Sequence, residues 1–85
     1  MTEFTRVDLA RTMRMAAGED ESVDLDGDIL DLSFEDLGYD SLAVMETASA
    51  VEREFALTLP EEDMSTIETP REFLALVNDR LKASA

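Results

Sequence analysis

The residues best placed for chemistry are Asp40 and Ser41, which follow a glycine and a tyrosine at the expected start of a long helix. Either side chain could accept hydrogen bonds from the first backbone amides of that helix and so act as its N-cap. A serine here would also be exposed beside unpaired N–H groups, where the positive end of the helix dipole favours an attached phosphate. Ser41 is therefore a candidate attachment point for a phosphodiester, and a simple capping role is the alternative.

Other residue types that commonly carry chemistry are absent from the sequence. The 85 residues include no Cys and no His, which excludes disulfides, thiolate nucleophiles and cysteine zinc sites and removes the most common general base. Hydrolytic or redox catalysis by the chain's own side chains is not expected, and neither is a bound metal.

The negative charge is large and unevenly distributed. Twenty-one acidic residues against seven basic ones give a net charge of −14. Residues 19–63 contain sixteen acids and only Arg53 as a base, so this segment carries −15 and the two flanking segments are nearly neutral. Such a surface disfavours nucleic acid and anionic membranes as partners and favours basic proteins.

Capping signals predict the first and last helices. Thr5 and Asp8 fit a capping box, Phe4 precedes it as in a hydrophobic staple, and a helix is expected over about 6–17. A second capping box, with proline at the first helical position, starts the last helix at Thr69-Pro70-Arg71-Glu72.

Residues 19–40 predict a long loop, and loops of that length are often functional. Gly38 is expected to end one short helical turn within it. Six apolar residues are expected to anchor the loop to the core: Leu25, Ile29, Leu30, Leu32, Phe34 and Leu37.

The second long helix is expected to begin at Asp40-Ser41 and to bury a stripe along one side. That stripe comprises Val44, Ala48, Val51 and Phe55, with Thr47 beside it and Met45, Glu46, Ser49, Glu52 and Arg53 facing outward. Pro60 then opens a short acidic helical segment over 61–64. No strand pattern is present, so we expect one all-α domain over residues 1–85, a small four-helix bundle with three long helices and one short one.

The segment Gly38-Tyr39-Asp40-Ser41-Leu42 resembles the Asp-Ser-Leu attachment motif of acyl carrier proteins. The resemblance extends over nearly the whole chain, because the long first loop, the acidic second helix, the short third helix and the Thr69-Pro70 start are also similar. With Ala43–Ala48 following the motif, the chain most resembles the discrete carriers of bacterial aromatic (type II) polyketide synthases.

The resemblance implies a carrier that performs no catalysis itself. A phosphopantetheinyl transferase would move 4′-phosphopantetheine from coenzyme A onto Ser41, between Asp40 and Leu42. The thiol of that arm would carry malonyl and growing polyketide chains as thioesters in the biosynthesis of antibiotics or other secondary metabolites. The further partners implied are the ketosynthase/chain-length factor, malonyl transferase, ketoreductase and cyclases. A fatty-acid or peptidyl carrier is the alternative within this class.

The resemblance also assigns contact roles. The second helix would recognise partner enzymes through Asp40, Leu42, Met45, Glu46, Glu52 and Arg53. Arg71 and Asn78 are candidates for contact with a polar poly-β-keto chain, and ordinary surface positions are the alternative for both.

A calcium-binding module is the competing function from another class. Asp24, Asp26, Asp28 and Glu35 imitate acidic positions of an EF-hand loop, but Ile29 stands where that loop requires glycine. No apolar run approaches the roughly 18 residues of a membrane span, and the first residues lack the pattern of a secretion signal. We therefore expect a soluble cytoplasmic monomer.

Overall fold

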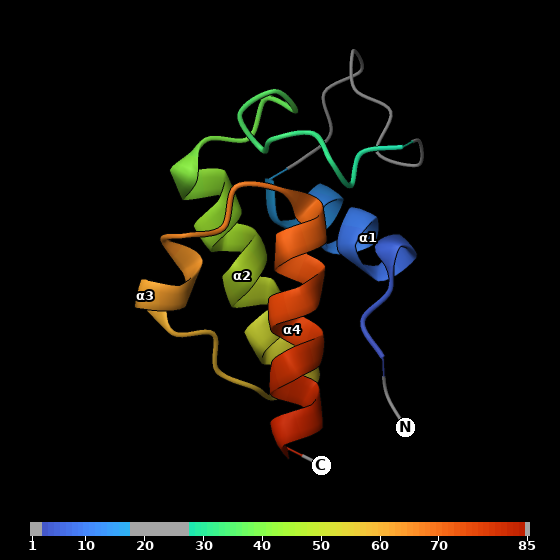
Figure 1. The fold of residues 1–85 in the computed structure, drawn as a ribbon, viewed down its shortest axis with the longest axis vertical. Helices are drawn as coiled ribbons and strands as arrows, with labels where there is room; N and C mark the ends of the chain where they lie inside the picture. Colours follow the sequence, from blue (N-terminus) through green and yellow to red (C-terminus); the bar gives the residue numbers. More distant parts are fainter. Residues whose placement is uncertain (1–2, 18–27, 85) are drawn as a thin grey trace.

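A computed structural model of the chain describes residues 3–17 and 28–84. Within them four helices follow one another: α1 (Arg6–Ala17), α2 (Ser41–Phe55), α3 (Glu61–Met64) and α4 (Pro70–Ser84). The described residues contain no strand, so the all-α prediction is confirmed. In Figure 1 α4 runs along the length of the molecule, with α3 and α1 on opposite sides of it.

Both predicted capping boxes form. At α1 the Asp8 carboxylate accepts from the Thr5 amide at 3.1 Å, and the Thr5 hydroxyl accepts from the Asp8 amide at 3.2 Å. At α4 the Glu72 carboxylate accepts from the Thr69 amide at 3.0 Å, and the Thr69 hydroxyl accepts from the Glu72 amide at 3.3 Å. Local sequence alone therefore sets the start of each helix.

The end of the long loop closes in a Schellman motif centred on Gly38. The Gly38 amide donates to the Glu35 carbonyl at 3.0 Å, and the Tyr39 amide donates to the Phe34 carbonyl at 2.9 Å. Gly38 has φ of 83°, in the left-handed region that this motif requires and that glycine enters without steric cost. The predicted turn ending at Gly38 is confirmed, and it carries the chain directly to the start of α2.

Three of the six predicted loop anchors, Ile29, Phe34 and Leu37, are almost fully buried. Leu30 is half-buried, whereas Leu32 is 44% exposed. The prediction for Leu32 is wrong because the Leu32 amide donates to the Ile29 carbonyl in a tight turn that directs this side chain outward. Leu25 lies outside the described residues.

All four phenylalanines of the chain form one continuous row through the core. Phe4 contacts Phe55 edge-on at 5.3 Å between ring centroids and Phe73 at 6.2 Å, and Phe73 contacts Phe34 at 6.1 Å. The row connects the segment before α1, the end of α2, the first turns of α4 and the long loop. Aromatic pairs of this geometry add to the stabilisation from burial itself.

Among the residues that the structure describes, three arginines outside the acidic central segment pair with acids inside it. These ion pairs are Arg11–Glu54 at 2.7 Å, Arg71–Asp31 at 2.7 Å and Arg80–Asp63 at 2.6 Å. Hydrogen bonds from Arg11 and Arg71 hold the pKa values of Glu54 and Asp31 below their ordinary values. The three acids therefore tie the central segment to α1 and α4, although exposed pairs contribute only about 0–1 kcal/mol each.

The C-terminal end of α2 carries an unusual backbone conformation. Ala56 caps the helix with φ of 54° and ψ of 49°, and its amide donates to the Glu52 carbonyl. Ala56 is the only described non-glycine residue with positive φ. This left-handed cap turns the chain toward Leu57 and Leu59, which pack against the core.

Candidate functional site

The start of α2 separates the capping role from the exposed hydroxyl. Asp40 is the N-cap, and its carboxylate accepts from the Ala43 amide at 2.8 Å. Ser41 is the first helical residue; its side chain is exposed, and its hydroxyl makes no hydrogen bond with any residue of the described parts of the chain. Of the two alternatives left open by the sequence, Asp40 performs the capping and Ser41 keeps its hydroxyl available.

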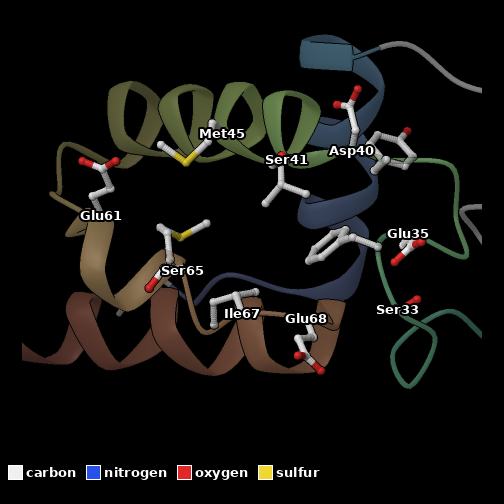
Figure 2. A pocket seen from close by; sticks show the side chains of 13 residues that line it. Ser33, Glu35, Asp40, Ser41, Met45, Glu61, Ser65, Ile67 and Glu68 are labelled. Carbon is white, nitrogen blue, oxygen red and sulfur yellow. The ribbon is translucent and has the colours of Figure 1, made fainter.

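A cavity of about 570 Å³ opens beside Ser41. Figure 2 shows that Ser41 and Met45 border it from α2, Ser65, Ile67 and Glu68 face them, and Ser33 and Glu35 lie at the loop end. Its apolar lining consists of Phe34, Tyr39, Val44, Met45, Met64 and Ile67. The cavity can therefore accept a flexible group with apolar parts that reaches in from Ser41.

The loop wall of this cavity is held by backbone contacts with the region before and at the start of α4. The Phe34 amide donates to the Glu68 carbonyl at 2.9 Å, and the Arg71 amide donates to the Leu30 carbonyl at 3.0 Å. The Phe34 ring also packs on Phe73. Sequence reasoning identified Phe34 as an anchor but missed its role as a cavity wall, because Glu68, its partner, is 34 positions away in the chain.

Two apolar side chains next to Ser41 face solvent, as predicted. Leu42 is 68% exposed and Met45 is 41% exposed. Glu46 and Arg53 are also exposed on α2, and Arg53 forms no ion pair with any residue in 3–17 or 28–84. Apolar groups beside exposed charges are typical of protein-binding surfaces.

Glu52 departs from the predicted outward-facing set. Its side chain is partly buried, and its carboxylate accepts from the Leu59 amide at 2.9 Å. The turn at Ala56 brings that amide back over the last turns of α2, where it needs an acceptor. Glu52 thus stabilises the connection between α2 and α3, and its predicted partner-binding role gains no support from this geometry.

Neither Arg71 nor Asn78 lines the cavity beside Ser41. Arg71 forms a bidentate pair with Asp31, with bonds of 2.7 and 3.1 Å. The Asn78 amide group holds the Phe4 backbone at both sides, accepting from its N–H at 2.8 Å and donating to its carbonyl at 3.0 Å. Both side chains therefore make hydrogen bonds within the protein. Arg71 is bound to the long loop, and Asn78 is bound to the segment before α1.

The proposed calcium loop lies mainly outside the described residues, which include Asp28 and Glu35 but neither Asp24 nor Asp26. Among the residues that the structure describes, no cluster of three or more His, Cys, Asp or Glu could hold a metal ion. None of the helices within 3–17 and 28–84 has the length and hydropathy of a membrane-spanning segment.

Comparison with known proteins gives consistent matches. A family model described as "Phosphopantetheine attachment site" matches residues 10–77. The chain is 46% identical over 84 residues to the actinorhodin polyketide synthase acyl carrier protein of Streptomyces coelicolor, covering 99% of this chain and 98% of that one. It is 56% identical over 73 residues to the granaticin polyketide synthase acyl carrier protein of Streptomyces violaceoruber, covering 85% and 86%.

The fold is also similar to solved structures. The solution structure of the hexanoyl form of the actinorhodin acyl carrier protein matches with a TM-score of 0.90 at 46% identity, covering 99% of this chain and 98% of that chain. The holo form of the same Streptomyces coelicolor protein matches with a TM-score of 0.84 over the same coverage.

Proposed function

This chain belongs to the phosphopantetheine-bearing acyl carrier proteins of polyketide synthases, and from that premise we propose that Ser41 is the residue that carries the arm. The match to the family model covers the region around Ser41 without identifying the attachment residue.

The observation that carries the proposal is that Asp40 caps α2 while the Ser41 hydroxyl stays exposed. Because the Asp40 carboxylate caps α2 through the Ala43 amide, modification of the Ser41 hydroxyl removes no hydrogen bond within the described protein. The first-turn backbone amides of α2 lie next to that hydroxyl, so a phosphodiester attached there is favoured by the helix dipole.

The residues around Ser41 fit a phosphopantetheine arm. Ser41 would hold the phosphate at the start of α2, and the cavity lined by Val44, Met45 and Ile67 gives the arm or its cargo an apolar surface. When bound, the arm supplies a thiol that carries acyl groups as thioesters, chemistry that a chain with no Cys lacks. In this proposal Arg71 and Asn78 keep their structural contacts, and the cavity is the better candidate for chain contact.

We propose further that the cargo is a polyketide. The matched relatives are named for polyketide pathways, among them actinorhodin and granaticin. On this basis malonyl and growing polyketide chains would pass between the ketosynthase/chain-length factor, the malonyl transferase, the ketoreductase and the cyclases. A phosphopantetheinyl transferase would load Ser41 first.

Intact mass spectrometry tests the attachment residue. The purified chain is incubated with coenzyme A and a broad-specificity phosphopantetheinyl transferase, and we expect the mass of one phosphopantetheine to be added. Ser41→Ala should gain nothing and should keep its melting temperature, because Asp40 remains as the cap. Thr58→Ala, which removes an exposed hydroxyl just after α2 and away from the cavity, should be loaded like the unmodified chain. Loading of Ser41→Ala would refute the assignment.

A further inference from the structure

A second hollow, of about 420 Å³, lies on the outer face of α2 where it meets α1. Of the five large apolar side chains that the structure shows exposed, three line this hollow: Met15 on α1, and Leu42 and Met45 on α2. Met15 is 70% exposed and Leu42 is 68% exposed. Apolar groups gathered in this way around a surface depression mark a binding surface more often than scattered exposure does.

The two walls of this hollow are fixed to each other. Arg11 on α1 donates two hydrogen bonds of 2.7 Å to the Glu54 carboxylate on α2. The same guanidinium contacts the Met15 sulfur at 3.8 Å. The hollow is therefore largely preformed, which lowers the ordering cost of binding.

The charges along the hollow are arranged with a polarity. Leu42 and Glu46 lie at the end near Ser41, whereas Arg53 lies at the opposite end. Eleven residues of helix place Arg53 about 16 Å from Leu42 along the axis. Arg53 is the only base in residues 19–63. A uniformly basic partner would therefore be attracted by Glu46 and repelled by Arg53.

The resemblance already implies contact between the transferase and α2; we propose that this contact extends across the hollow onto α1, with Met15 as a specificity residue for loading of Ser41. The proposal rests on the proposed function, because an enzyme acting on the Ser41 hydroxyl has to cover the adjacent Leu42. The partner surface places an apolar side chain against Leu42 and Met15, a basic group near Glu46 and a carboxylate opposite Arg53. Helix α1 is thus part of the recognition surface, and Arg53 sets the direction in which the partner lies along α2.

Matched substitutions on α1 test the apolar half of the surface. Met15→Gln should lower kcat/KM for transfer of phosphopantetheine from coenzyme A about fivefold, through KM. Val7→Gln is the control, because Val7 is a comparably exposed apolar residue of α1, at 72%, that does not line the hollow. Circular dichroism verifies that both variants keep the fold. Equal loading kinetics for the two variants would overturn the proposal.

A charge exchange tests the polar half. The double variant Glu46→Arg/Arg53→Glu keeps the net charge of −14 but reverses the polarity of the hollow, and we expect kcat/KM to fall about tenfold. Arg6→Glu/Glu62→Arg, which exchanges two exposed charges outside both this hollow and the cavity beside Ser41, should load at the normal rate. If both exchanges load normally, only net charge matters and the proposal fails. Failure of the proposed function gives a different result, because the unmodified chain would then not be loaded or Ser41→Ala would still be loaded.

Discussion

The first backbone amides of α4 and of α2 are both capped by side chains, but different residue types do the capping. At α4 the Thr69 hydroxyl accepts from the Glu72 amide, and the Glu72 carboxylate accepts from the Glu68 and Thr69 amides at 2.9 and 3.0 Å. At α2 the Asp40 carboxylate accepts alone, and the hydroxyl of Ser41 stands one residue further along.

This difference of one position decides what each hydroxyl can do. A hydroxyl at the N-cap is bound to the backbone and belongs to the fold. A hydroxyl at the first helical residue remains exposed beside the same free amides, so chemistry on it costs the fold little. The comparison predicts that the two helix starts respond differently to substitution.

The largest expected effect comes from the turn that delivers the chain to α2. Gly38→Ala forces an alanine into φ of 83°, which should lower the free energy of unfolding by about 1–2 kcal/mol. Urea denaturation followed by circular dichroism measures it. Gly38→Asn should lose less, because asparagine tolerates this region better; equal stability of Gly38→Ala and the unmodified chain would contradict the Schellman geometry.

Removal of either helix cap should lower the stability of the protein by a similar amount, but only one removal should affect loading. Asp40→Ala and Thr69→Ala should each lower the free energy of unfolding by about 1 kcal/mol. Only Asp40→Ala should also slow loading at Ser41, since it loosens the turn that presents the hydroxyl. Thermal melts and transfer kinetics on both variants make the comparison, and slow loading of a folded Thr69→Ala would break it.

The smallest expected effect is a pH dependence at the start of α4. Backbone hydrogen bonds from Glu68 and Thr69 hold the pKa of Glu72 below its ordinary value of 4.5. A lowered folded-state pKa stabilises the protein above pH 4.5, and this contribution is lost as pH falls through that lower pKa. The melting temperature should therefore exceed that of Glu72→Gln at pH 7, with the difference closing below pH 4.5.

The control for that measurement removes one negative charge elsewhere. Glu61→Gln eliminates an exposed carboxylate that makes no hydrogen bond within the described residues. A melting difference for Glu72→Gln that stayed constant from pH 7 to pH 3 would exclude the capping contribution of this carboxylate.

Features set by neighbouring residues were predictable from the sequence. The start of α1 follows from Thr5 and Asp8, the start of α4 from Thr69 and Glu72, and the end of the loop turn from Gly38. In each of these signals the interacting residues lie only three to five positions apart, so the interaction can be predicted from a short stretch of sequence. The choice between Asp40 and Ser41 as the cap was not predictable in this way, because both residue types accept hydrogen bonds from first-turn amides.

Features that depend on distant partners could not be predicted. Asn78 binds the backbone of Phe4 across 74 positions, and Arg71 pairs with Asp31 across 40. Glu52 turns back to Leu59 only because the chain reverses at Ala56. In each case a polar side chain that the sequence placed on the surface is bound to a group that only the folded chain brings near.

The left-handed conformation of Ala56 has a practical consequence for engineering this protein. An alanine in this region carries about 1–2 kcal/mol of steric strain that a glycine would not, although glycine loses more conformational freedom on folding. Ala56 lines neither of the two hollows beside α2. If the relief of strain exceeds the loss of conformational freedom, Ala56→Gly raises the melting temperature. It does so without changing any side chain that lines the cavity beside Ser41 or the hollow between α1 and α2.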